Sequence, residues 1–115
     1  MKVEDFFGGG VTLYYKGKLH EDVVFCHDEQ KSLRLLLEII AEKREPPHNI
    51  TSISSGLRYH GIRTNSPYVS IDVNVLALCG AVEYTNIGLH NAIIKPKYSK
   101  VKVTDEKGKL VVKLD

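Results

Sequence analysis

The segment from Ser66 to Tyr84 constrains the fold more than any other, because its apolar residues fit two kinds of secondary structure. Read as a helix, it has an N-cap at Ser66 and a proline at the first helical position, where a missing backbone N–H costs nothing. Its apolar residues then recur at steps of four and three along one face: Val69, Val73 and Leu76. Gly80 suits the left-handed residue just past a helix end, and Val82 begins a strand.

The same segment also reads as a strand. From Val69 to Val75, apolar and polar residues alternate, and the β-branched side chains fall on one face. This pattern alone leaves both interpretations open. The order of cap, apolar steps, glycine and valine resembles the recognition helix and first wing strand of winged helix-turn-helix domains, and this resemblance implies a helix over residues 66–78.

A helix is also expected from Asp28, which is placed to cap it, to about Arg44. Apolar residues form a stripe along this helix and predict its core-facing side: Leu33, Leu36, Leu37 and Ile40, widened by Leu35 and Ile39. Pro46-Pro47 ends the helix, because a residue that precedes proline is displaced from the α region.

Another helix is expected from Ile50 to about His60, with Asn49 as its cap. Its inner face is apolar: Ile50, Ile53 and Leu57. Several serines and a glycine make this helix weak in isolation, so it depends on packing against its neighbours. Gly61 ends it, and residues 62–65 form the turn that leads into the next helix.

Alternating β-branched and aromatic residues predict an N-terminal and a C-terminal β-hairpin, within residues 1–27 and 96–115. The paired segments are 11–15 with 19–26, and 100–103 with 110–114. A smaller pair of strands is expected after the segment described first. It joins residues 82–84 to residues 92–95 through a loop at residues 85–91.

With 115 residues, 43% of them hydrophobic, the chain is expected to form one domain over residues 1–115. Cys26 and Cys79 each lie in an apolar stretch, so we expect two buried free thiols in a reducing compartment. No run approaches the roughly 18 apolar residues of a membrane span, and the first residues lack a signal-peptide pattern. A cytoplasmic location, away from membranes, is therefore expected.

The net charge of +2 is unevenly distributed along the chain. Residues 1–48 carry seven basic and nine acidic side chains, residues 49–85 carry two and two, and residues 86–115 carry seven and three. The positive field is therefore expected at the C-terminal end.

Residues 30–95 taken together resemble the winged helix-turn-helix superfamily, in which a third helix is followed by a two-stranded wing. The order of helices, glycine and paired strands carries this resemblance. It implies an α+β fold with a winged helix-turn-helix core at residues 28–95, to which the N-terminal and C-terminal β-hairpins are added. The alternative is a mixed α+β fold in which residues 68–78 form a strand.

The resemblance implies that the helix from Ser66 to Leu78 enters the major groove of duplex DNA. Carried over by position, the nucleic-acid-binding residues are polar or basic and lie on this helix, just before it, or along the wing and the tail: Arg58, His60, Arg63, Thr64, Ser66, Tyr68, Ser70, Asn74, Lys95, Lys97, Lys100 and Lys102. Asn pairs with adenine, whereas the basic and hydroxyl side chains bind phosphate.

The helix departs from the family pattern in its charge. It has no Lys or Arg, carries Asp72, and places Ile71 and Val75 on its outward side. Because phosphate neutralisation supplies most non-specific affinity, such a DNA reader must draw its positive charge from the flanks. Alternatively, Ile71, Val75 and Leu78 form a surface for a protein partner or a second copy of the chain.

The histidines and hydroxyls follow no recognisable catalytic or metal motif. The nearest set to a metal site lacks ligand spacing: His20, Cys26 and His27. The residue types of a triad occur without a nucleophile elbow: His60, Ser66 and Asp72. We therefore expect no enzymatic activity, no metal and no cofactor. Six tyrosines invite a base-stacking role, but positions at the edge of the core explain them more simply.

The sequence thus predicts a small protein that binds double-stranded DNA as a homodimer and acts as a transcriptional regulator or genome-organising protein. The alternative is a non-enzymatic protein–protein interaction or structural module that does not bind DNA.

Overall fold

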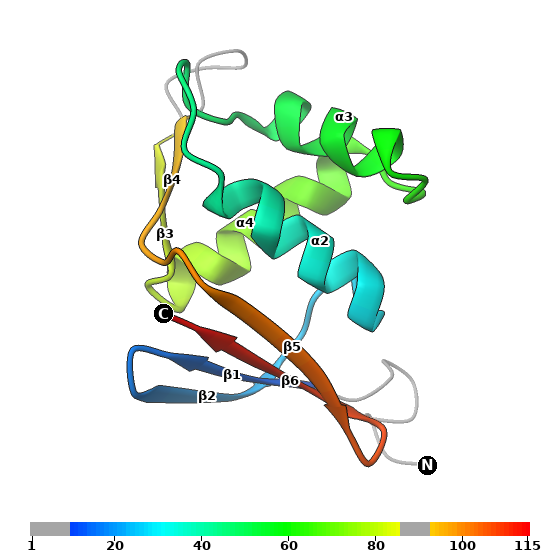
Figure 1. Ribbon diagram of the computed structural model, residues 1–115, viewed down its shortest axis with the longest axis vertical. Helices are drawn as coiled ribbons and strands as arrows, with labels where there is room; N and C mark the ends of the chain where they lie inside the picture. Colours follow the sequence, from blue (N-terminus) through cyan, green and yellow to red (C-terminus); the bar gives the residue numbers. More distant parts are fainter. Residues whose placement is uncertain (1–9, 86–92) are drawn as a thin grey trace.

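The computed structural model describes residues 10–85 and 93–115. This part of the chain has an α+β fold with three helices and two sheets, and Figure 1 shows the helices stacked above the larger sheet. The helices are α2 (Gln30–Ala41), α3 (Ile50–Tyr59) and α4 (Ser66–Leu78).

Helix α4 confirms the helical interpretation of the central segment, and the strand alternative for residues 68–78 is wrong. Its N-cap is Asn65, whose side chain accepts a hydrogen bond from the Tyr68 N–H, so Ser66 is the first helical residue and not the predicted cap. Gly80 follows the helix with a φ of +83°, as its position predicted. The helix prevails because it buries one complete apolar stripe: Val69, Val73 and Leu76.

Helix α3 begins as predicted, because Asn49 and Ser52 form a capping box. The Asn49 side-chain oxygen accepts a hydrogen bond from the Ser52 N–H at 2.8 Å, and the Ser52 hydroxyl accepts one from the Asn49 N–H at 2.9 Å. Helix α2 starts later than predicted. Its N-cap is Glu29, not Asp28, and it ends at Ala41, before Arg44.

The two predicted end hairpins are β1 (Val11–Tyr15) with β2 (Lys18–Val23), and β5 (Val101–Glu106) with β6 (Lys109–Leu114). Each turns through a Lys-Gly pair with positive φ at both residues, which matches the twist of the flanking strands. The hairpins also pair with each other, because β1 and β6 run parallel with Leu13 opposite Val112. One four-stranded sheet results, in the order β2-β1-β6-β5.

The second sheet pairs β3 (Val82–Thr85) with β4 (Ile93–Pro96), close to the predicted bounds. The chain between α2 and α3 joins it through one bridge, in which the Ile94 N–H donates to the His48 carbonyl at 3.0 Å. Thr85 belongs to β3, whereas the rest of the predicted loop at residues 85–91, together with Ala92, lies outside the described residues.

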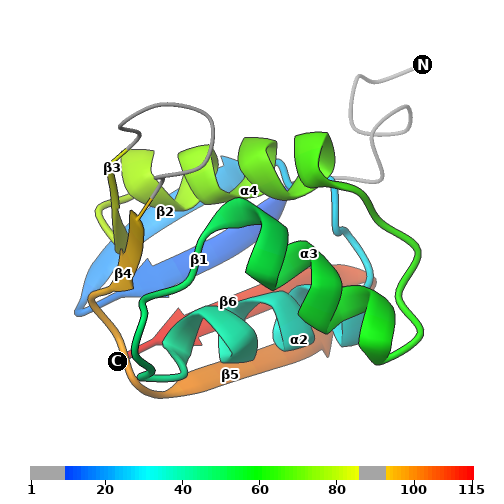
Figure 2. The ribbon, with the colours of Figure 1, turned by 90° about the horizontal axis from the view of Figure 1, so that it is seen from above.

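The helices cover one face of the four-stranded sheet, and Figure 2 shows α2 above β5 and β6. The predicted stripe of α2 packs into a core that draws on both hairpins: Leu33, Leu36, Leu37 and Ile40 with Leu13, Val112 and Leu114. The buried Tyr98 hydroxyl donates to the Leu37 carbonyl at 2.7 Å, which fixes the chain between the two sheets against α2. Burial also raises the pKa of Tyr98.

Candidate nucleic-acid interface

The exposed side of α4 is neutral and largely apolar. Tyr68 and Ile71 are each 50% exposed and Leu78 is 88% exposed. Asn74 is exposed between them, and its side-chain N–H donates to the Ser70 carbonyl at 2.8 Å. Of the four binding residues predicted on this helix, Tyr68 and Asn74 therefore reach solvent, whereas Ser66 and Ser70 are half-buried.

Asp72, the one charged residue of α4, does not lie on its exposed side. It is fully buried, because it stands three residues after Val69 and four before Leu76, within the buried stripe. That spacing is a sequence signal that sequence reasoning missed. The exposed side of α4 therefore carries no carboxylate.

Three N–H groups of the segment that joins β2 to α2 satisfy the buried carboxylate of Asp72. The backbone N–H of Cys26 donates to Oδ1 at 2.6 Å, and the backbone N–H of His27 donates to Oδ2 at 3.0 Å. The ring of His27 adds a contact from Nδ1 to Oδ2 at 2.5 Å. A buried carboxylate needs such partners, and these hold the segment against α4.

His27 also connects this carboxylate to the turn between α3 and α4. Its Nε2 lies 2.8 Å from the hydroxyl of Thr64, one residue before the N-cap of α4. Because a carboxylate oxygen accepts, the Nδ1–H of His27 donates to Asp72, and Nε2 is left for the hydrogen bond with the Thr64 hydroxyl. The chain Asp72–His27–Thr64 thus fixes the turn that leads into α4.

The triad residue types noted in the sequence do not come together as His60, Ser66 and Asp72. His60 is exposed at the end of α3, and the half-buried Ser66 hydroxyl lies 3.5 Å from Ser54. The hydrogen-bonded order is Thr64–His27–Asp72, which no local sequence signal indicated, because His27 and Asp72 are 45 residues apart.

Positive charge beside α4 comes from the end of α3 and the following turn, where Arg58 and Arg63 are exposed. From Pro46 to Val82 the sequence has one acidic residue, Asp72, and that residue is buried. The exposed surface of α3, the turn and α4 is therefore free of acidic side chains across this described stretch. Thr64 and Ser66, also predicted as phosphate contacts, turn partly into the protein.

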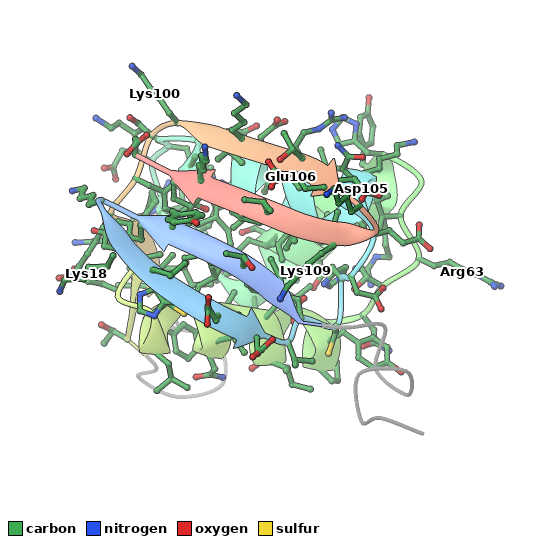
Figure 3. The ribbon with its side chains drawn as sticks, turned by 90° about the horizontal axis from the view of Figure 1, so that it is seen from below. Lys18, Arg63, Lys100, Asp105, Glu106 and Lys109 are labelled. Carbon is green, nitrogen blue, oxygen red and sulfur yellow. The ribbon has the colours of Figure 1, made fainter. Side chains whose placement is uncertain are left out.

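The predicted lysines form a separate group. Lys95 is exposed on β4, Lys97 follows it, and Lys100 and Lys102 lie at the start of β5 and on its solvent face. Figure 3 shows Arg63 and Lys100 projecting from opposite ends of the molecule. The residues predicted as one set are therefore divided between two regions.

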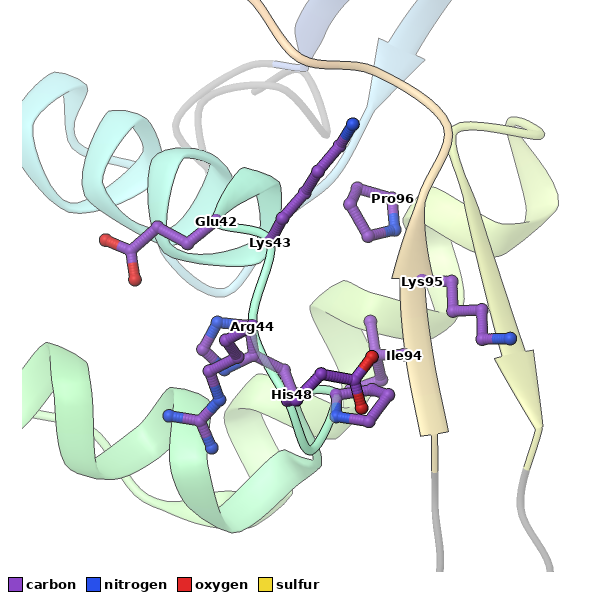
Figure 4. A pocket seen from close by; sticks show the side chains of 9 residues that line it. Glu42, Lys43, Arg44, His48, Ile94, Lys95 and Pro96 are labelled. Carbon is purple, nitrogen blue, oxygen red and sulfur yellow. The ribbon is translucent and has the colours of Figure 1, made fainter.

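A hollow of about 500 Å³ lies between β4 and the chain that joins α2 to α3. Figure 4 shows Glu42 directed away from β4, whereas Lys43 extends towards Pro96. The charged ends of Glu42 and Lys43 thus point away from each other. His48 is a buried residue at this hollow, and its Nδ1 forms a hydrogen bond of 3.1 Å with the Ser52 hydroxyl. Desolvation lowers the pKa of His48, and the charge of Arg44 adds to this effect.

The two cysteines are not the buried thiols that the sequence predicted. Cys26 is exposed, although its backbone N–H donates to the buried Asp72, and Cys79 is half-buried at the end of α4. Desolvation and the charges of Asp72 and Asp28 raise the pKa of the Cys26 thiol. Desolvation alone raises the pKa of Cys79.

Within residues 10–85 and 93–115, no cluster of three His, Cys, Asp or Glu side chains is placed to hold a metal ion. None of the described helices combines the length and the apolar character needed to cross a membrane. Comparison of the chain with models of protein families, with curated proteins and with solved structures gave no significant match.

Proposed function

We propose that residues 30–95 form a winged helix-turn-helix domain that binds duplex DNA through α4. The observation that carries this proposal is the connectivity of its elements. Helix α2 leads through the bridging residue His48 to α3, then to α4, and α4 is followed by the β3–β4 pair that receives the bridge. The winged helix resemblance of the sequence implies this order, with α4 as the helix that enters the major groove.

The size and charge of α4 support this role. Its 13 residues span about 20 Å, and its exposed side lacks a carboxylate that would repel phosphate. Tyr68 and Asn74 present polar atoms from that side. The Asn74 amide recognises adenine when its hydrogen bond to the Ser70 carbonyl is replaced by hydrogen bonds to the base.

Phosphate contacts then come from both ends of α4. Arg58 and Arg63 lie towards its N-terminal end, and Lys95 on β4 and Lys97 just after that strand follow its C-terminal end. A duplex lying along the helix has one such pair beside each end, so the flanks supply the charge that α4 lacks. One helix of this length reads few base pairs, so we propose a homodimer that reads two half-sites as a transcriptional regulator or genome-organising protein.

The test is a titration of a fluorescent duplex with the full chain at about 50 mM salt and above. Arg58→Ala/Arg63→Ala and Lys95→Ala/Lys97→Ala should each weaken binding and reduce the slope of log K against log salt by about two. Lys18→Ala/Lys113→Ala removes the same charge from the four-stranded sheet and serves as the matched control. Equal effects of all three double variants, or absence of binding, would refute the proposal.

A second candidate function is docking of a protein on α4. The exposed Ile71 and Leu78 favour it, because apolar side chains on one helix face suit a protein surface better than a DNA groove. Sedimentation analysis of the full chain distinguishes the two. A tight dimer that Leu78→Lys dissociates, together with absence of DNA binding, would support this second function.

A further inference from the structure

Tyr59 is far more exposed than the tyrosines that pack against the core. It is the last residue of α3 and 86% exposed, whereas Tyr98 is buried and Tyr15 and Tyr84 pack against the core. Its ring forms a T-shaped pair with that of His60, with the centroids 5.3 Å apart and the planes at 90°. A largely exposed aromatic side chain is therefore presented at the start of the turn to α4.

The residues around Tyr59 are cationic or neutral. Arg58, His60 and Arg63 are exposed within five residues of it, and no Asp or Glu occurs from Pro46 to Ile71. An exposed aromatic ring with neighbouring cations is the chemistry that binds single-stranded nucleic acid, because the ring stacks on a base and the cations hold phosphates.

We infer that the segment from Arg58 to Arg63 binds unpaired nucleotides that adjoin a duplex held by α4. This inference rests on the proposed function. The segment leads through Thr64 directly to Asn65, the N-cap of α4, so it lies beside a duplex whose major groove holds that helix. Tyr59 stacks on the first unpaired base, and Arg58 and Arg63 contact the phosphates on either side of it.

The hydrogen bond of Thr64 to His27 supports the inference, because it holds this segment in one position relative to α4. A fixed turn holds the segment that carries Tyr59 beside the duplex without a large cost in conformational entropy.

The test compares a blunt duplex, the same duplex with a single-stranded extension of about five nucleotides, and the single strand alone. The extension should tighten binding of the full chain by about tenfold. Tyr59→Ala should abolish this gain and leave the affinity for blunt duplex unchanged, whereas Tyr59→Phe should retain the gain. Tyr14→Ala, at an exposed tyrosine on the four-stranded sheet, is the matched control.

Equal affinity of the wild type for blunt and extended duplexes overturns the inference and leaves the proposed function intact. Equal loss of both affinities in Tyr59→Ala also overturns it, because the ring would then contact paired DNA. Conversely, absence of binding to blunt duplex with Tyr59-dependent binding of the single strand refutes the proposed function and retains the stacking role. Because Tyr59 is exposed, circular dichroism should show Tyr59→Ala to be folded.

Discussion

The imidazole of His27 contacts the buried carboxylate of Asp72 at 2.5 Å, and the two residues are separated by 45 positions in the sequence. The contact joins helix α4 to the segment between β2 and α2. The opposite nitrogen of the same ring reaches Thr64 in the turn before α4. The buried carboxylate of Asp72 therefore helps, together with the apolar stripe of the helix, to hold α4 in position.

Replacement of Asp72 should destabilise the protein strongly. Asp72→Ala leaves two backbone N–H groups and the His27 ring without an acceptor, and we expect the free energy of unfolding to fall by about 3 kcal/mol. Urea denaturation measures the change. Asp28→Ala, at an exposed carboxylate of the same segment, should change stability by less than about 0.5 kcal/mol. Similar values for the two variants would contradict this role of Asp72.

The hydroxyl of Thr64 should contribute less, because it makes one hydrogen bond to His27. Thr64→Val is expected to lower the free energy of unfolding by about 1 kcal/mol, and Thr64→Ser, which keeps the hydroxyl, by a smaller amount. Hydrogen exchange should also show faster opening at the start of α4 in Thr64→Val. If valine and serine behave alike, the hydrogen bond does not fix the turn.

A positive charge at position 71 separates the two proposed roles of α4. Ile71 is half exposed, so Ile71→Lys should leave the free energy of unfolding within about 0.5 kcal/mol of the wild type. If α4 lies in a DNA groove, the new ammonium group tightens binding at low salt and steepens the salt slope by about one. Tyr14→Lys adds the same charge on the sheet and should have little effect. Weaker binding of Ile71→Lys to DNA would contradict the groove position.

The stability of the protein should decrease as the pH falls, partly because of His48. Burial lowers the pKa of His48 from its ordinary value of 6.5, so the unfolded chain binds a proton at that residue before the folded protein does. The free energy of unfolding therefore rises with pH between the lowered pKa of His48 in the folded protein and its ordinary value of 6.5. As the pH falls below 6.5, this contribution to stability is lost. Urea denaturation at pH 5.5 and 7.5 should show a smaller pH dependence in His48→Gln. An unchanged dependence would show that His48 does not contribute.

Cys26 should react slowly with alkylating reagents despite its exposure. Its thiol has a raised pKa, because of desolvation and of two neighbouring carboxylates, and only the thiolate is nucleophilic. In a Cys79→Ser background, the rate of alkylation should reach its midpoint at a pH above the usual thiol value, and Asp28→Asn should lower that midpoint. A midpoint unaffected by Asp28→Asn would exclude an electrostatic contribution of this carboxylate.

Local signals in the sequence predicted most of the elements. Asn49 and Gly61 delimit α3, and Gly80 ends the segment that forms α4, because capping oxygens and left-handed glycines act on adjacent residues. The assignment of α4 was ambiguous because its valines satisfy both a helical and an alternating pattern. Packing decided it, since only the helix buries Val69, Val73 and Leu76 together.

Relationships between distant residues escaped prediction. The pairing of Leu13 with Val112 joins segments that carry no shared local signal, so the sequence predicted two hairpins but not their common sheet. The inward direction of Asp72 followed from its helical spacing, yet its partner His27 lies in a loop that no periodicity places. Tyr59 was grouped with five other tyrosines. Its much greater exposure in the folded protein distinguishes it, and exposure cannot be read from the sequence.

The parallel register of β1 and β6 also bears on how the protein responds to force. Val11 begins one strand and Leu114 ends the other, so tension applied through these two residues pulls the strands past each other lengthwise. The hydrogen bonds of a parallel pair are evenly spaced, and such shear loads them together and not one after another. Stretched in this direction, the protein should resist extension until the whole ladder yields at once.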